Sequence, residues 1–269
     1  MLARHGLSTK KSLGQHFLVD DNIVGRIIEL AALSGEETVL EVGPGIGTLT
    51  VPLCEHAHAV VAVERDRDLE PVLAQTTSGC PRFALVHADA VEVTAAQVAG
   101  PFGPPSALVA NLPYQVAATV VLRFFQEFTS LEQATVMVQS EVADRMAAQP
   151  GTKAYGSYTV KLRLLASPRG RFAVAPGCFL PPPRVDSAVL RLERSPLSDD
   201  AALIAAASRV ADCAFAQRRK TIRNSLKATL GVDTGLLDAA LSATGIDGRV
   251  RAETLPPEAF IELAAALAV

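Results

Sequence analysis

Four consecutive residues, Asn111, Leu112, Pro113 and Tyr114, combine groups that can hold a planar ring bearing an amino group. The Asn111 side-chain carbonyl and the backbone carbonyl of Leu112 or Pro113 can accept the two hydrogens of an exocyclic amine. The Tyr114 ring can stack on the same base, a contact that contributes about 1–3 kcal/mol. The tetrapeptide therefore predicts a site for a nucleobase amine, although in isolation it is also typical of a turn with a packed aromatic ring.

The chemistry that suits such a site is methyl transfer to the amine. An adenine amino nitrogen is a poor nucleophile because its lone pair is delocalised into the ring. Carbonyl acceptors that are already in place favour a more tetrahedral, reactive nitrogen as charge develops, and alignment with a methyl donor adds a proximity effect. A strong general base is not required, since the methylated ammonium is acidic and can lose its proton to water.

A glycine turn earlier in the chain predicts the donor site. Gly43, Gly45 and Gly47 give the pattern G-x-G-x-G, one residue shorter than the dinucleotide fingerprint. A dinucleotide needs a helix N-terminus for its pyrophosphate, whereas S-adenosylmethionine has no phosphate. The acidic Glu41, directly before the turn, suits the cationic amino acid portion of S-adenosylmethionine. By itself such a turn is weak evidence for any ligand.

Two further acids, Glu64 and Asp89, stand at the carboxyl ends of the next two apolar runs. Glu64 can accept hydrogen bonds from two ribose hydroxyls, and Asp89 can accept one from an adenine amino group. The alternative for both is helix capping or solvation at a strand end. With these acids in place, S-adenosylmethionine is the favoured cofactor.

The elements that must position these residues are short apolar strands separated by helices. Strands are predicted at 38–42, 59–63, 83–87, 107–110 and 134–138, with helices at 22–33, from the glycine turn to about 54, at 65–77 and at 116–125. This alternation predicts an α/β fold, with a parallel sheet covered on both faces. Ligands of such sheets bind beyond the carboxyl ends of the strands, where all the residues above fall.

The remaining pattern predicts a late strand of the same sheet at 185–192 and then helices alone. A linker at 195–200 precedes helical segments at 201–215, 220–230, 235–243 and 257–267. We therefore expect a methyltransferase domain at 1–194, dependent on S-adenosylmethionine, and a small helical domain at 195–269 that contributes to RNA binding.

Bulk composition fits a soluble cytoplasmic protein of 269 residues, with 49% hydrophobic residues and no membrane-length apolar run or signal peptide. The predicted site needs only a monomer, which is the oligomeric state we expect. The four cysteines are far apart, and nothing near His56 and His58 completes a ligand set, so no metal site is expected.

The net charge of −3 argues mildly against nucleic acid as a partner. Basic residues nevertheless gather between 145 and 194, and a second cluster predicts RNA contacts through Arg218, Arg219, Lys220 and Arg223.

Several blocks of sequence resemble the ribosomal RNA adenine dimethyltransferase family. They are KSLGQHFL at 11–18, EVGPGIG at 41–47, NLPY at 111–114, FLPPPRVDS at 179–187 and FAQRRKT at 215–221. The last block, with RAETL at 251–255, is most similar to the small-subunit (16S) enzymes associated with kasugamycin sensitivity. These blocks span nearly the whole chain, and their combination is highly specific.

The resemblance implies a Rossmann-like class I methyltransferase sheet with helices on both faces and an all-helical C-terminal domain. It implies dimethylation of two adjacent adenines in a hairpin loop near the 3′ end of small-subunit ribosomal RNA, on a pre-ribosomal particle. A hairpin loop lowers the cost of taking a base out of its stack. It also implies a cofactor pocket lined by His16, Leu18, Gly43, Glu64, Asp89 and Asn111, with Phe179 covering the far face of the target base.

Two departures from the family pattern are His16 and Gln115, where relatives often have Asn. Four other functions remain open. A large-subunit adenine methylase shares the acceptor motif but not the carboxyl-terminal blocks. A DNA-adenine or glutamine-amide methyltransferase more often has Pro-Pro-Tyr. A dehydrogenase is disfavoured by the glycine spacing, and a non-catalytic assembly factor by the intact Asn111 and Tyr114.

Overall fold

The computed structural model describes residues 15–268. The first four residues of the block at 11–18, and the basic residues Arg4, Lys10 and Lys11, lie outside this range. By their contacts the described residues form two compact units. The first comprises 15–143 with 168–193, and the second 144–167 with 194–268. The domain boundary predicted from the sequence lies after residue 194 and so assigns residues 144–167 to the first domain. That assignment of two domains stays a prediction.

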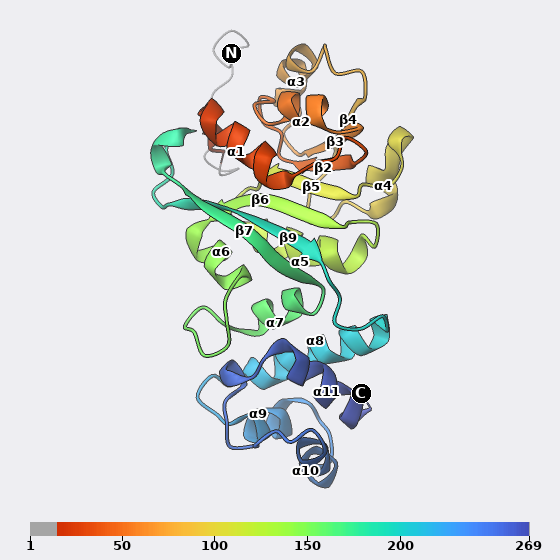
Figure 1. Cartoon of the computed structure of the whole chain (residues 1–269), viewed down its shortest axis with the longest axis vertical. Coiled ribbons are helices and arrows are strands. Elements are labelled where there is room, and N and C mark those ends of the chain that lie inside the picture. The colour runs from red at the N-terminus through yellow and green to blue at the C-terminus, as the bar shows by residue number, and fades with distance from the viewer. Residues whose placement is uncertain (1–14, 269) are drawn as a thin grey trace. The chain divides into compact units, whose positions relative to one another are not determined.

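A seven-stranded sheet forms the centre of the first unit (Figure 1). Its order is β4 (Phe83–His87), β3 (Ala59–Glu64), β2 (Thr38–Val42), β5 (Ala107–Asn111), β6 (Gln133–Gln139), β9 (Ser187–Arg194) and β7 (Ala166–Val174). The first five are mutually parallel. The expected late strand, β9, belongs to the sheet but runs antiparallel to β6, so the sheet is mixed and not wholly parallel.

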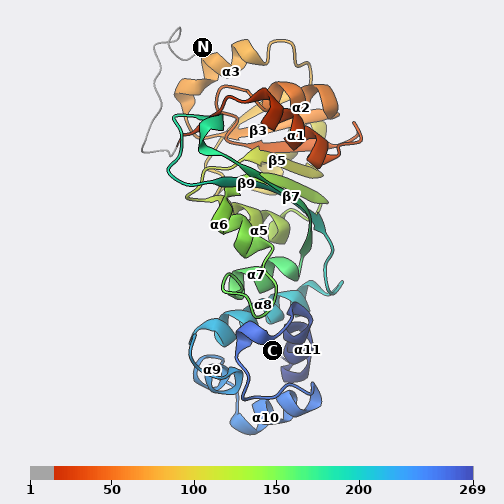
Figure 2. The same cartoon turned by 60° about the vertical axis from the view of Figure 1, so that its left-hand side comes forward.

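Helices cover both faces of this sheet, as the two views agree (Figures 1 and 2). On one face lie α1 (Asp21–Ala31), α2 (Thr50–His56) and α3 (Glu70–Thr76), and α5 (Ala117–Glu127) lies on the other. Ile27, Leu53 and Val60 are fully buried between α1, α2 and the sheet. Their apolar spacing in the sequence is what predicted these elements.

Shorter elements complete the first unit. A two-stranded antiparallel sheet pairs β1 (Phe17–Leu18) with β8 (Phe179–Leu180). The short helices are α4 (Ala95–Ala99), α6 (Ser140–Met146), which continues into the second unit, and the 3₁₀ turns η3 (Arg67–Leu69), η4 (Gly100–Phe102) and η5 (Pro176–Cys178). The predicted helix at 65–77 is thus η3 followed by α3, with Pro71 in the first turn of α3, where its missing N–H costs nothing.

The second unit is helical and has its own core. Its helices are α7 (Ser157–Arg163), α8 (Ala201–Phe215), α9 (Ile222–Thr229), α10 (Thr234–Ala243) and α11 (Pro257–Leu267), with the turn η6 (Ala252–Thr254). Val210, Leu226, Leu237 and Phe260 are fully buried in it. Among the described helices of the chain, none has the length and apolarity needed to cross a bilayer.

Candidate active site

A cleft lies at the carboxyl ends of β2, β3, β4 and β5, within the first unit. Parallel strands bring these ends to one edge of the sheet, so residues separated widely in sequence meet there. The predicted site residues that line the cleft are His16, Leu18, Glu41, Gly43, Gly45, Glu64, Asp89, Asn111, Leu112, Pro113 and Tyr114. Gly47 and Phe179 are not among the residues that line it.

The glycine turn is shaped by packing against protein as well as by the cleft. Gly45 has φ +60°, and a Cβ there would lie 2.9 Å from the ring of Phe17. Gly47 has φ +89°, and a Cβ there would lie 2.8 Å from Thr76 Cγ2 on α3. Side chains are excluded at both positions by the backbone conformation and by the close neighbour. Gly47 therefore packs the turn onto α3, and Gly45 faces the cleft.

Glu64 ends β3 with its carboxylate held by backbone amides. Its Oε1 accepts from Asp66 N at 2.8 Å, and its Oε2 accepts from Gly45 N at 3.4 Å. Burial raises the pKa of Glu64, and these amides partly oppose that effect. Each carboxylate oxygen has a second lone pair, so the oriented carboxylate can also accept from a diol in the cleft.

Glu41 is a buried acid at the cleft, with only 1% of its surface exposed. Its Oε2 has no hydrogen-bond partner among the described residues. Burial raises the pKa of Glu41 to about 8; the Thr50 side chain partly opposes this effect, and the nearby Glu64 charge adds to it. A buried carboxyl with an unused oxygen costs stability unless a ligand compensates it, and a cationic group in the cleft would do so.

Asp89 follows β4 and is held in place from two sides. Its Oδ1 accepts from Val91 N at 3.0 Å, and its Oδ2 pairs with Arg65 Nη1 at 3.1 Å. Arg65, which sequence reasoning did not single out, also lines the cleft. The Arg65 side chain is 69% exposed, so this ion pair is solvent-screened and orients the carboxylate more than it stabilises the fold.

The orientation of the Asn111 amide follows from its neighbour. Asn111 Nδ2 donates to the backbone carbonyl of His16 at 3.2 Å. Because a carbonyl oxygen can only accept, the amide nitrogen must face His16. This leaves the Asn111 Oδ1 available as an acceptor at the cleft.

The two candidate backbone carbonyls differ in availability. The Pro113 carbonyl already accepts from Val116 N and Ala117 N, both at 3.1 Å, at the start of α5. No hydrogen bond to the Leu112 carbonyl occurs within the described chain. Leu112 therefore offers the freer second acceptor, a choice that the sequence left open.

Tyr114 is fixed at both its hydroxyl and its ring. The hydroxyl makes a 2.5 Å hydrogen bond with Oγ of Ser187, which is fully buried at the start of β9. Burial raises the pKa of Tyr114, so its hydroxyl stays protonated at neutral pH. The Tyr114 ring stacks with that of His16, with centroids 5.7 Å apart and planes inclined by 21°. Ser187 was not predicted as a site residue, although it ends the block at 179–187.

His16 is anchored in turn, because its Nδ1 lies 2.7 Å from the Pro181 carbonyl and must donate to it. Phe179, in the same segment as Pro181, is 3% exposed and packs in the core beside Leu18 and Ile23. Its predicted contact with the target base stays a prediction, since the ring does not line the cleft here.

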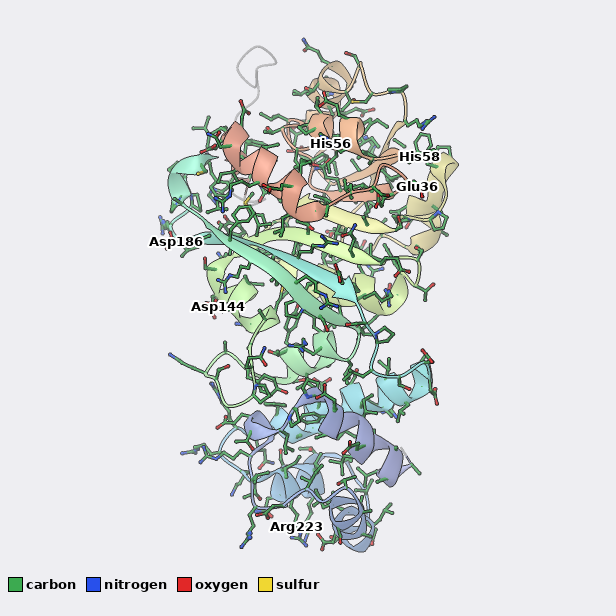
Figure 3. The ribbon with its side chains drawn as sticks, viewed as in Figure 1. Glu36, His56, His58, Asp144, Asp186 and Arg223 are labelled. Carbon is green, nitrogen blue, oxygen red and sulfur yellow. The ribbon has the colours of Figure 1, made fainter. Side chains whose placement is uncertain are left out.

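The predicted RNA-binding residues lie in the second unit. Arg218, Arg219 and Lys220 are exposed in the turn between α8 and α9, and no ion pair involves them within residues 15–268. Arg223, labelled in Figure 3, differs, because its guanidinium forms two hydrogen bonds with Asp238, at 2.5 and 2.7 Å. The charge of Arg223 is thus largely balanced within the protein. The first three remain free for phosphate.

The two histidines considered for a metal, His56 and His58 (labelled in Figure 3), have separate partners. His56 Nδ1 lies 2.8 Å from the Pro52 carbonyl, and His58 Nδ1 lies 3.1 Å from Arg82 Nη1. Throughout the described chain, no cluster of three or more His, Cys, Asp or Glu side chains is placed to hold a metal ion.

The sheet order, the glycine turn after β2 and the acids at the ends of β3 and β4 define a Rossmann-like methyltransferase. A family model described as ribosomal RNA adenine dimethylase matches residues 6–268. The chain therefore belongs to the ribosomal RNA adenine dimethylase family and is an enzyme of that class.

Known proteins of the family resemble the chain over nearly its full length. A protein of Magnetococcus marinus named ribosomal RNA small subunit methyltransferase A is 42% identical, over 98% of this chain and 94% of its own length. One of Streptomyces griseus with the same name is 44% identical, over 98% and 91%. Among solved structures, the 23S rRNA methyltransferase ErmE superposes with a TM-score of 0.72 at 29% identity, covering 94% of this chain and all of that one.

Proposed function

We propose that this enzyme transfers methyl groups from S-adenosylmethionine to the exocyclic amines of two adjacent adenines in small-subunit ribosomal RNA. The adenines lie in a hairpin loop near the 3′ end, and the reaction occurs on a pre-ribosomal particle during ribosome maturation. The observation that carries the proposal is the Asn111 amide, whose nitrogen is held by the His16 carbonyl and whose oxygen remains free at the cleft.

The residues of the cleft fit S-adenosylmethionine. The buried, unpartnered Oε2 of Glu41 suits the cationic amino acid portion. The oriented carboxylate of Glu64 suits the ribose hydroxyls, and Asp89 with Ala90 suits the adenine. When bound, S-adenosylmethionine supplies an electrophilic methyl group on a sulfonium centre.

The acceptor side of the cleft then acts on the target amine. Asn111 Oδ1 and the Leu112 carbonyl accept its two hydrogens, which increases the electron density on nitrogen as the new bond forms. Tyr114 stacks on the base, and its bond to Ser187 holds the ring in place. The Tyr114 face that His16 now covers becomes available to the base only if the His16 ring shifts. Water takes the proton from the methylated nitrogen.

The small subunit is favoured as substrate by the relatives at 42 and 44% identity. The second candidate is the large subunit, because the 23S rRNA methyltransferase ErmE shares the fold and 29% identity. The exposed Arg218, Arg219 and Lys220 support an RNA substrate in either case, as sequence-independent phosphate contacts.

The deciding experiment incubates the protein with labelled S-adenosylmethionine and either unmethylated small or large subunits, and maps the modified bases. We expect label on two adjacent adenines of the small-subunit RNA alone. Label in the large subunit would establish the second candidate instead.

An Asn111→Ala variant tests the mechanism in the same assay. Methylation should fall by about 100-fold or more, because one preorganised acceptor is lost, while the particle is still bound. Near-normal incorporation of methyl groups by this variant would show that the Asn111 oxygen is not an acceptor in the reaction.

A further inference from the structure

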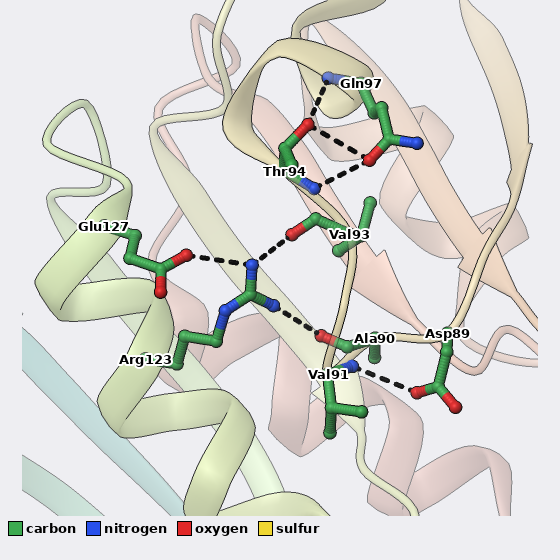
Figure 4. A network of polar contacts seen from close by, with 8 residues as sticks. All are labelled: Asp89, Ala90, Val91, Val93, Thr94, Gln97, Arg123 and Glu127. Atoms are coloured by element: carbon green, nitrogen blue, oxygen red, sulfur yellow. Dashed lines mark hydrogen bonds and ion pairs between the residues drawn. The ribbon is translucent and has the colours of Figure 1, made fainter.

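Arg123, on α5, joins the helix that follows the acceptor residues to the loop that follows Asp89 (Figure 4). Its Nη1 donates to the Ala90 carbonyl at 3.2 Å, and its Nη2 donates to the Val93 carbonyl at 2.5 Å. Nη2 also lies 2.8 Å from Glu127 Oε2, one helical turn further along. The side chain is 17% exposed, so these bonds form largely away from solvent.

The loop that Arg123 holds carries one wall of the cleft. Ala88, Asp89 and Ala90 all line it. Within the loop, the Asp89 carbonyl accepts from Glu92 N at 3.0 Å and from Val93 N at 2.9 Å. At its far end, α4 begins with a capping box in which Thr94 and Gln97 bond reciprocally. The segment from Asp89 to α4 is therefore ordered internally, and Arg123 links it to α5.

The other wall is formed by residues 111–116, which lead directly into α5. The helix is tied to the acceptor residues, because the Pro113 carbonyl accepts from Val116 N and Ala117 N at the start of α5. Val120, Val121 and Phe124 are fully buried along it, which keeps it rigid against the sheet. The acceptor residues are thus connected to Arg123 through a rigid helix. Two hydrogen bonds then connect Arg123 to the loop that carries Ala88, Asp89 and Ala90.

We propose that Arg123 is a positioning residue for methyl transfer, which fixes the loop at 89–93 and thereby sets the affinity for the adenine end of S-adenosylmethionine. This inference rests on the proposed function of the same cleft. Arg123 itself does not line the cleft, so it acts through the two carbonyls it binds. A planar guanidinium suits this role because it presents several donors in a fixed geometry.

The test compares Arg123→Met, Arg123→Lys and Glu127→Gln with the wild-type protein. Binding of S-adenosylmethionine is measured by calorimetry, methylation by KM and kcat, and the loop at 89–94 by amide hydrogen exchange without ligand. Arg123→Met should raise the dissociation constant and the KM about tenfold and speed exchange in the loop. The kcat at saturating S-adenosylmethionine should fall less than threefold, because the reacting groups are untouched.

The matched variants separate positioning from general stability. Arg123→Lys keeps a charged donor near both carbonyls and should recover binding to within about threefold of wild type. Glu127→Gln leaves both carbonyl bonds in place and should bind normally with an unchanged loop. If Arg123→Met does not fold, Arg123→Gln takes its place, and its loss of affinity must be accompanied by faster exchange confined to 89–94.

Two results would overturn the inference: an Arg123→Met variant that binds S-adenosylmethionine as wild type does, or unchanged exchange at 89–94 in both Arg123 variants. Failure of the proposed function would be recognised differently, as a wild-type protein that does not bind S-adenosylmethionine. In that case the exchange measurement would still show whether Arg123 holds the loop.

Discussion

At the scale of single residues, the cleft depends on polar groups whose orientation is fixed by a neighbour. The His16 carbonyl orients the Asn111 amide, Ser187 holds the Tyr114 hydroxyl, and backbone amides hold Glu64. Such preorganisation lowers the cost of reaching the reactive arrangement, because the groups do not have to be ordered when substrate binds. Glu41 is the exception, since part of its carboxyl has no partner within the described residues.

Glu41 should make stability depend on pH. The ordinary pKa of a glutamate is 4.5, and burial raises that of Glu41 to about 8. Between these values the unfolded chain loses the proton and the folded protein keeps it, so folding becomes less favourable as pH rises. Glu41→Gln removes this effect. We expect its melting temperature to equal that of wild type near pH 5 and to exceed it by about 3–6 °C near pH 8.5.

Thermal unfolding followed by circular dichroism at the two pH values measures this difference. Glu36→Gln is the control, because Glu36 is an exposed glutamate near the start of β2 (Figure 3). A melting-temperature difference between Glu41→Gln and wild type that does not vary with pH would contradict the prediction.

At the scale of elements, the glycine turn joins β2 to α2 and sets the distance to α3. Gly45 leaves room for the Phe17 ring and Gly47 leaves room for Thr76.

The strands and the main helices of the site follow apolar spacing closely, and the bounds of β2, β4, α8 and α11 are those predicted from the sequence. The strand β7 was missed because Pro168 and Gly170 are unfavourable inside a strand. They are tolerated there because β7 lies at the edge of the sheet.

Substitution at Gly47 should lower stability without removing the cofactor site. Gly47→Ala places a Cβ 2.8 Å from Thr76 Cγ2 on a backbone with φ +89°. We expect a loss of about 1–3 kcal/mol in the free energy of unfolding. The affinity for S-adenosylmethionine should change less than about threefold, since Gly47 does not line the cleft.

Chemical denaturation and calorimetry measure the two quantities. Adding Thr76→Ala to the variant removes the steric contact but not the backbone strain, so it should restore part of the lost stability. A Gly47→Ala protein of normal stability that no longer binds S-adenosylmethionine would show instead that Gly47 acts on the ligand.

At the scale of the whole molecule, the chain is acidic overall, with a net charge of −3, yet carries exposed basic residues in its second unit. The overall charge is a poor guide to RNA binding, because phosphate contacts depend on local clusters. Within such a basic cluster, only the residues that are not already paired with an acid remain available for phosphate. Arg223 is paired with Asp238, whereas Arg218, Arg219 and Lys220, in the turn before α9, form no ion pair within residues 15–268.

Charge reversal at Arg218, Arg219 and Lys220 should weaken binding to the small subunit and leave S-adenosylmethionine binding intact. If each side chain contacts one phosphate, the slope of log affinity against log salt should become shallower by about 2–3. Filter binding over a range of salt concentrations measures this slope. Arg249→Gln is the control, because Arg249 is exposed but paired with Asp247. Equal affinity for variant and wild type at every salt concentration would remove the cluster from the RNA-binding surface.

The sequence alone determined the family, the order of the main strands along the chain and most residues of the cleft. These follow from local apolar periodicity and from short motifs whose chemistry can be read residue by residue. Only the tertiary structure decided that β9 runs antiparallel, that Leu112 and not Pro113 has the freer carbonyl, and that Arg223 is paired. Each of these depends on contacts between segments far apart or on hydrogen bonds already made, which local spacing does not encode.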